Sequence, residues 1–164
     1  MVILKDVLGH KLRVVFCGTA VGAASARLQA YYAGPGNRFL ATLFEIGLTP
    51  RQLEPAEYPS IAQFGLGLTD LAKGIAGADT VLKDGHFGRG ELLVKIERYK
   101  PQVLAFTSKR AAEEYLGEAV SYGRHSHTIG GTAVFVLPSP SGAARRYWSI
   151  QPWRDLARET TFGK

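Results

Sequence analysis

The chain has 164 residues, 46% of them hydrophobic, which is enough for one substantial core and too little for two ordinary domains. We therefore expect a single domain over residues 1–164. No apolar run approaches the roughly 20 residues that span a bilayer, and Met1–Gly9 lack a basic-then-apolar signal pattern. The one cysteine, Cys17, excludes a disulfide framework, so we expect a cytoplasmic protein with no membrane contact. The formal net charge of +6 favours a polyanionic partner.

Four short apolar runs are typical of buried strands. They are Arg13–Cys17, Gly65–Thr69, Val103–Thr107 and Thr132–Leu137. Helical patterns alternate with these runs, and this order predicts a three-layer α/β/α fold around a mostly parallel, four-stranded sheet. In such folds ligands bind beyond the carboxyl ends of the strands, where this chain has its densest runs of Gly, Ser, Thr and Pro.

The expected helices are bounded by capping and stop residues. One is capped by Asn37 and stopped by Gly47, one covers Glu91–Tyr99, and one is capped by Ser108 and closed by Gly117. The final stretch, 145–158, is expected to be helical only in part, because Pro152 interrupts it.

A loop of small residues, Gly18–Ala26, follows the first strand and opens a helix. Small residues let backbone amides approach a planar or anionic ligand closely. The loop lacks the Lys-Ser/Thr of a P-loop and the glycine spacing of a dinucleotide site. Tyr31 and Tyr32 come soon after it. Their rings suit stacking on a base, although packing within the core explains two tyrosines equally well.

Six segments together resemble the mismatch-specific uracil-DNA and thymine-DNA glycosylases of the uracil-DNA glycosylase superfamily, and the resemblance runs from about Val14 to Arg145. The segments are Gly18–Ala26, Gly34–Phe39, Gly47–Leu53, Gly67–Leu71, Thr107–Lys109 and Leu137–Gly142. The resemblance implies a uracil-DNA glycosylase-like fold and a monomeric, cofactor-free repair enzyme. Such an enzyme flips uracil out of double-stranded DNA, notably from a G:U mismatch, and hydrolyses its N-glycosidic bond to leave an abasic site.

The resemblance also implies which residues meet the DNA. Tyr32 would stack on the flipped base, whose edge the backbones of Thr19 and Tyr32 would read. The implied substrate-binding residues are Gly18, Thr19, Ala20, Ser25, Tyr32 and Asn37. The implied DNA-binding residues are Ser108, Lys109, Ser139, Ser141, Gly142, Ala143 and Arg145. The family commonly carries a large apolar wedge in the last loop, but this chain offers Ala143 and Ala144, which leaves Arg145 as a plug or phosphate contact.

The first motif departs from the family. Relatives read Gly-x-Asn-Pro-Gly, in which the Asn positions the attacking water, and here Ala20 occupies the Asn position. We expect a carboxylate to supply the missing function, because an ionised carboxylate stabilises an oxocarbenium-like sugar or orients water. Asp70, just past the second strand, is the first candidate, with a helix cap or surface ion pair as its structural alternative. Asp79 is the second candidate.

Metal chemistry is not expected. His125 and His127 are one residue apart, but neither Cys17 nor another histidine completes a familiar ligand spacing, so we place the pair in a solvated loop. Phosphate contacts are expected from basic residues in loops at one sheet edge, although a solvated surface with no partner explains any single one of them at least as well. These are Arg38, Lys73, Lys109, Arg110, Arg124, Arg145 and Arg146.

Two further interpretations of the sequence stay open. The loss of the motif-one Asn also fits a non-catalytic or weakly catalytic module that recognises abasic sites or mismatches. A nucleotide-binding enzyme unrelated to repair rests on the Gly18–Ala26 loop alone. For a glycosylase, the small side chains of this loop admit thymine, etheno-cytosine, hypoxanthine and xanthine as well as uracil.

Overall fold

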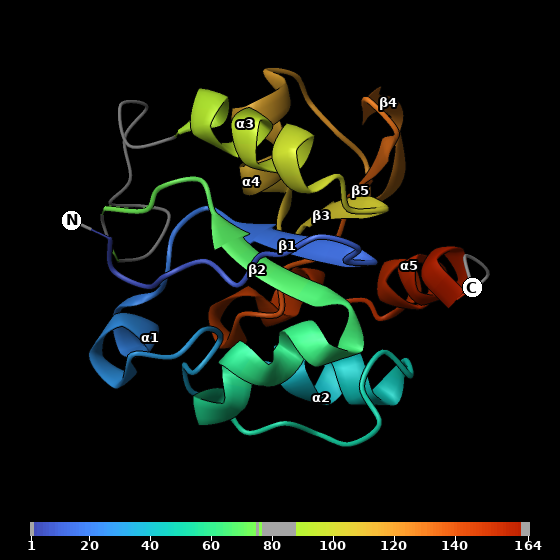
Figure 1. Ribbon diagram of the computed structural model, residues 1–164. Helices are drawn as coiled ribbons and strands as arrows, with labels where there is room; N and C mark the ends of the chain where they lie inside the picture. Colours follow the sequence, from blue (N-terminus) through green and yellow to red (C-terminus); the bar gives the residue numbers. More distant parts are fainter. Residues whose placement is uncertain (1, 75, 77–87, 162–164) are drawn as a thin grey trace.

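The sheet has five strands in the order β2-β1-β3-β5-β4 (Figure 1). The structure is a computed structural model that describes residues 2–74, 76 and 88–161. Its strands are β1 (Val14–Gly18), β2 (Leu66–Asp70), β3 (Val103–Phe106), β4 (Gly123–Ile129) and β5 (Thr132–Val136). β2, β1, β3 and β5 run parallel, and β4 pairs antiparallel with β5. The α/β class with a mostly parallel sheet is confirmed, and the expected count of four strands is wrong by one.

The central strand shows why the apolar runs form this sheet. In β1, Val14 and Phe16 point into one apolar core and Val15 and Cys17 into the other, and all four are fully buried. A strand covered on both faces is apolar without alternation, as parallel strands between helix layers are. The core therefore lies in two layers, one on each side of the sheet.

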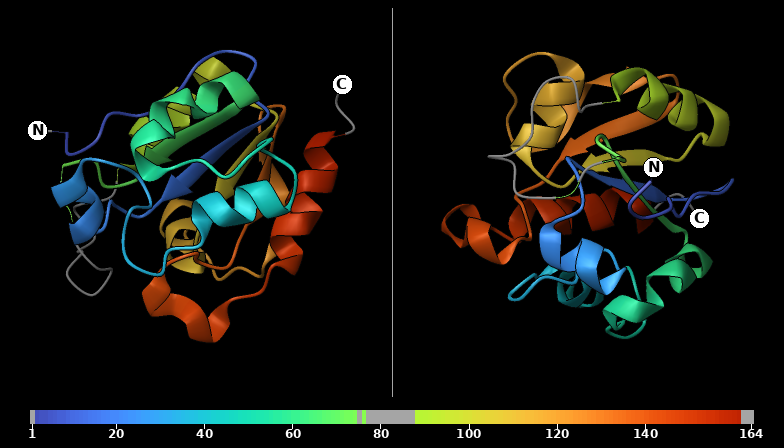
Figure 2. Two further views of the ribbon diagram at one scale, coloured as in Figure 1. Left: turned by 90° about the horizontal axis from the view of Figure 1, so that it is seen from below. Right: turned by 90° about the vertical axis from the view of Figure 1, so that its left-hand side faces the viewer.

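Helices cover both faces of the sheet. They are α1 (Ala23–Leu28), α2 (Phe39–Glu45), the 3₁₀ segment η1 (Pro55–Phe64), α3 (Arg89–Tyr99), α4 (Lys109–Leu116), the 3₁₀ segment η4 (Gly142–Tyr147) and α5 (Gln151–Thr161). α3 and α4 cover one face (Figure 1), and the left view of Figure 2 looks onto the other, covered by α2, η1 and α5.

The helix boundaries largely follow the capping residues. Ser108 Oγ accepts the Ala111 N–H at 3.0 Å, and Gly117 ends α4 with a φ of +74°. Asn37 Oδ1 accepts the Phe39 N–H at 2.9 Å, although the N-cap position itself belongs to Arg38. The capping predictions for α2 and α4 thus identify the right turns, with Asn37 displaced by one position.

Two sequence expectations fail for physical reasons. His125 and His127 lie in β4 and not in the expected loop. The sequence does not indicate this strand, because its side chains are largely exposed and show no apolar alternation. Pro152 does not interrupt a helix. It lies in the first turn of α5, where no intrahelical partner exists for its missing N–H.

The amino-terminal segment lies along the outer edge of β2. Val7 pairs antiparallel with Leu68 through two backbone hydrogen bonds of 2.9 and 2.8 Å. The Ile3 N–H also donates to the Lys73 carbonyl at 3.0 Å. Residues before β1 therefore help to fix the chain at the carboxyl end of β2. Within the described ranges, no helix is long and apolar enough to cross a membrane.

Candidate active site

A cavity of about 380 Å³ opens at the carboxyl edge of the sheet. Residues from the ends of all four parallel strands line it, as expected for ligand sites in α/β folds. The lining consists of Gly18, Thr19, Ala20, Val21, Gly22, Ala24, Ser25, Tyr31, Tyr32, Gly34, Asn37, Asp70, Thr107, Ser108, Ser139, Pro140, Ser141, Ala143 and Ala144. Its volume falls within the range typical of small-molecule sites.

Most residues singled out from the sequence meet at this cavity. All six expected substrate-binding positions line it: Gly18, Thr19, Ala20, Ser25, Tyr32 and Asn37. Of the expected DNA-binding positions, Ser108, Ser139, Ser141 and Ala143 line it, whereas Lys109, Gly142 and Arg145 lie outside the lining. Asp79, the second catalytic candidate, lies outside the described residues.

Asp70 ends β2 and lines the cavity next to the first loop. Its side chain is only 5% exposed. A methyl group added to Gly18 would lie 3.3 Å from Asp70 Oδ1, so this oxygen lies against the start of the small-residue loop. The other oxygen, Oδ2, is 3.2 Å from Lys73 Nζ. The carboxylate therefore lies between the cavity on one side and a largely covered cation on the other, and it is neither a helix cap nor a surface ion pair.

The ionisation of Asp70 reflects two opposing effects. Burial raises the pKa of its carboxyl, while the Lys73 ammonium and the Tyr31 hydroxyl lower it. Burial is the larger effect, so the pKa of Asp70 lies above its ordinary value. A carboxylate with a raised pKa is a stronger base than an ordinary aspartate, and it sits where a ligand would bind.

Tyr32 presents an aromatic ring at the same cavity. Its ring stacks on Phe39 with centroids 3.8 Å apart and planes at 22°. Its hydroxyl lies 3.3 Å from Thr107 Oγ1, and its backbone takes a φ of +55°, in the left-handed region that non-glycine residues rarely adopt. The ring is held from one face, from its hydroxyl and from its backbone, and such rigidity suits a stacking platform.

Tyr31 and Thr107, which the sequence placed in the aromatic pair and in the Thr107–Lys109 segment, both line the cavity. The sequence did not show that Lys73 and Asp6 stand behind Asp70. Lys73 was assigned to phosphate contact, and this is wrong because its side chain is 12% exposed and bound to two carboxylates. Nothing in the sequence pairs Asp6 with Lys73 across 67 positions.

The last loop packs tightly against the segment before α2. Pro140 accepts the Arg38 N–H at 2.8 Å, and a methyl group on Gly142 would lie 2.5 Å from the Pro35 carbonyl oxygen. Arg145 follows in η4 and is exposed. This contact fixes the 139–142 loop at the mouth of the cavity.

The basic residues divide into two groups. Arg110 pairs with Glu114 and Arg124 with Glu159, so their charges are compensated. Arg145 and Arg146 are exposed in η4, Arg38 lies over the Trp148 ring, and Lys109 lies over the Tyr122 ring. Arg38, Lys109, Arg145 and Arg146 lie in or beside the segments that form the cavity mouth, and they remain candidates for phosphate contact.

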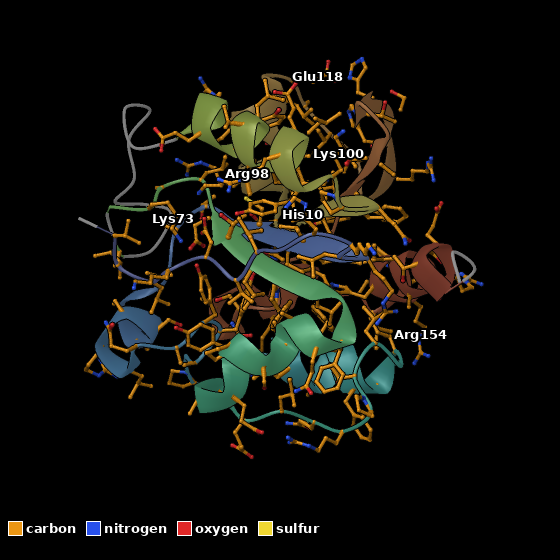
Figure 3. The ribbon with its side chains drawn as sticks, in the orientation of Figure 1. His10, Lys73, Arg98, Lys100, Glu118 and Arg154 are labelled. Atoms are coloured by element: carbon orange, nitrogen blue, oxygen red, sulfur yellow. The ribbon has the colours of Figure 1, made fainter. Side chains whose placement is uncertain are left out.

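The two histidines of β4 approach one carboxylate. His125 Nε2 and His127 Nδ1 lie 3.3 and 3.5 Å from Glu118 Oε1. In the described part of the chain, this is the one group of three side chains whose ligand atoms lie close enough together to hold a metal ion. His125 Nδ1 accepts the His127 N–H at 3.1 Å, so the neutral ring carries its proton on Nε2, toward Glu118. None of these three residues lines the cavity, and Figure 3 shows Glu118 well away from Lys73.

Cys17 is fully buried in β1, as expected. Burial raises the pKa of its thiol well above the ordinary value, and the Asp70 carboxylate adds to the rise. A protonated thiol within the core is a poor nucleophile.

A cavity at the carboxyl edge of the sheet, lined by a carboxylate and an aromatic ring, is where α/β proteins of this kind bind their ligands. The model of the uracil DNA glycosylase superfamily matches residues 6–157, so the chain belongs to that superfamily. A solution NMR structure from Methanosarcina acetivorans, provisionally described as a uracil DNA glycosylase, has the same fold. It has a TM-score of 0.68 and 21% sequence identity, with 96% of each chain covered. Membership of the superfamily suggests glycosylase activity on uracil or damaged bases in DNA.

Proposed function

We propose that the protein is a monofunctional, mismatch-type uracil-DNA glycosylase in which Asp70 replaces the missing motif-one Asn. The observation that carries this proposal is the position of Asp70. It is the only carboxylate among the described residues of the cavity lining, and its Oδ1 lies against Gly18. A flipped uracil fits a cavity of about 380 Å³ walled by small side chains.

The reaction proceeds through cleavage of the C1′–N1 bond, whose electron pair leaves with the base. The sugar gains oxocarbenium character, and the Asp70 carboxylate stabilises this positive charge. Water then adds to C1′, and its proton passes to Asp70, which later releases it. A base with a raised pKa accepts this proton more readily than an ordinary carboxylate does.

Binding of the flipped base is assigned to Tyr32 and the first loop. Base stacking on an aromatic ring contributes roughly 1–3 kcal/mol. Ser25 Oγ accepts the Ala33 N–H at 3.0 Å, so Ser25 supports the loop more than it reads the base. Lys73 does not act as a Schiff-base nucleophile, because its ammonium is held by two carboxylates. Hydrolysis by water is therefore the simpler mechanism.

The test is a substrate panel under single-turnover conditions. Duplexes with G:U, A:U or G:T pairs and single-stranded uracil are incubated with the protein, and abasic sites are then cleaved with alkali. We expect G:U to react fastest, because a mispaired base costs least to flip. No strand cleavage above an enzyme-free blank on any substrate would overturn the enzymatic proposal.

The binding-module alternative is favoured by one observation, Ala20 in place of the family's Asn. It predicts a gel-shift preference for abasic or mismatched duplexes with no base release at any enzyme concentration. Base release from G:U that depends on Asp70 contradicts it.

A further inference from the structure

We propose that Lys73 is a positioning residue whose ammonium group, fixed by Asp6, keeps the Asp70 carboxylate ionised and directed at Gly18. This inference deepens the proposed function and rests on it, because it gives Asp70 the catalytic role. Figure 3 shows Lys73 at the carboxyl end of β2. The last residue of this strand, Asp70, lines the cavity.

Lys73 contacts three oxygen acceptors, one of them on Asp70. Its Nζ lies 3.2 Å from Asp70 Oδ2, 2.9 Å from Asp6 Oδ1 and 2.8 Å from the Tyr31 hydroxyl oxygen. An ammonium group has three N–H donors, and these three acceptors use all of them. Its side chain is 12% exposed, so water screens these contacts weakly. The cation is therefore fixed behind the cavity.

Asp6 holds Lys73 from the other side. Asp6 Oδ1 also accepts the Thr69 hydroxyl at 2.7 Å, and Oδ2 pairs with Lys95 Nζ at 2.7 Å. Burial opposes ionisation of Asp6, but the contacts with Lys95, Lys73 and Thr69 outweigh it, so the pKa of Asp6 lies below its ordinary value. Asp6 is thus ionised at neutral pH. With both aspartates ionised, two carboxylates and two ammonium groups balance.

The backbone places this cluster. Val7 pairs with Leu68 on β2, which sets Asp6 beside Thr69. The Ile3 N–H binds the carbonyl of Lys73, three residues beyond Asp70. The amino-terminal segment thereby fixes both partners of the Asp6–Lys73 pair relative to β2. The position of the cluster is therefore set by backbone pairing between distant segments.

Asp70 depends on this one cation for its charge. A carboxylate that is 5% exposed resists ionisation unless a partner offsets the loss of water. Burial raises the pKa of Tyr31, Tyr32 and Cys17, so these three groups near Asp70 are neutral. In the described part of the chain, Lys73 is the cation in contact with Asp70, and Asp6 is the nearby anion that opposes its charge.

The direct test follows the ¹³C carboxyl resonance of Asp70 during a pH titration, with Asp70→Asn to assign it. Lys73→Met removes the cation and is expected to raise the titration midpoint by about 1–3 pH units. Lys73→Arg keeps the charge and restores a midpoint close to that of the wild type. Lys5→Met is the matched control. It removes an exposed cation from the amino-terminal segment that carries Asp6, and it should leave the Asp70 midpoint unchanged.

Asp6→Asn provides a second test, in which the Asp70 midpoint should move in the opposite direction to that in Lys73→Met. This test remains informative if Lys73→Met does not fold. The amide keeps an acceptor oxygen for Lys73 and removes the negative charge that raises the pKa of Asp70. We therefore expect the Asp70 midpoint to fall. A midpoint that rises in Asp6→Asn would show general damage to the cluster and would overturn the proposal.

The failure of this inference is distinguishable from the failure of the proposed function. The acid limb of the single-turnover rate with G:U duplex should move with the Asp70 midpoint in each variant. A midpoint that moves without the acid limb keeps the role of Lys73 and refutes catalysis by Asp70. A Lys73→Met midpoint equal to that of the wild type overturns the positioning role, whatever the activity.

Discussion

At the scale of single residues, Asp70 is the proposed catalytic group and it also lowers the stability of the folded state. Its pKa is higher in the folded state than in the unfolded chain, so its ionised form favours unfolding. This cost is fully present above the folded pKa and disappears once the pH falls below the ordinary value near 4, where both states are protonated. The ionised Asp70 side chain therefore lowers the stability of the fold at neutral pH.

Asp70→Asn should raise the free energy of unfolding at pH 8, because it removes a buried charge and keeps the shape of the side chain. The gain should shrink as the pH is lowered toward 4. Urea denaturation at several pH values measures both effects. A variant less stable than the wild type at pH 8, with an unchanged denaturant slope, would make Asp70 a structural ion-pair partner instead.

Ala20 is the second residue at which the site departs from its family. Ala20→Asn should restore a group that orients water, and it should raise the single-turnover rate on G:U duplex about tenfold, or about 1.4 kcal/mol. Adding Asp70→Asn to this background should cost less than it does in the wild type, because the two groups then share one task. Ala20→Leu, which fills similar space without polarity, is the control. If Ala20→Asn is no faster than Ala20→Leu, the absence of a polar side chain at position 20 does not limit the rate.

At the scale of elements, the sequence predicted what local patterns determine. Buried apolar runs identified β1, β2, β3 and β5, and parallel strand ends then brought the Gly18 loop, Asp70 and the 139–142 loop to one edge. β4 could not be found, because an exposed edge strand needs no apolar alternation. The Asp6–Lys73 pair could not be found either, because it arises from pairing between distant segments.

Gly142→Ala tests whether the tight contact between the 139–142 loop and Pro35 contributes to stability and to duplex binding. The added methyl group would meet the Pro35 carbonyl oxygen at 2.5 Å and Gly36 at 3.3 Å, so the backbone must shift. We expect a loss of about 1–3 kcal/mol in stability together with weaker duplex binding. Thermal unfolding and a DNA-binding titration measure the two.

Gly131→Ala is the matched control, because its methyl group would meet nothing within 4 Å. It should change stability by less than about 0.5 kcal/mol. Equal behaviour of Gly142→Ala and Gly131→Ala would show that the loop yields freely at Gly142.

At the scale of the whole molecule, only some of the described cations behind the net charge of +6 are free of a carboxylate partner and can bind DNA. Lys73, Arg110 and Arg124 are neutralised by carboxylates within the fold. Arg145 remains exposed near the mouth of the cavity. The net charge alone did not predict this division, because it depends on which acids the fold brings to each cation.

Arg145→Ala should lower the dependence of duplex affinity on salt, reducing the log–log slope by about 1 if Arg145 meets one phosphate. Arg158→Ala is the control, since this exposed arginine pairs with Asp155 on α5. Its slope should match that of the wild type. A slope reduced by Arg158→Ala but not by Arg145→Ala would place the DNA on another face.

The most direct test of the account compares the wild type with Asp70→Asn in single-turnover release of uracil from a G:U duplex at pH 8. Affinity is measured in parallel on the same duplex carrying an abasic-site analogue, and Asp155→Asn serves as a surface control. We predict that Asp70→Asn slows release at least tenfold, or about 1.4 kcal/mol, while affinity and the control stay at wild-type values. An unchanged rate, or a loss of affinity with no loss of rate, would contradict catalysis by Asp70.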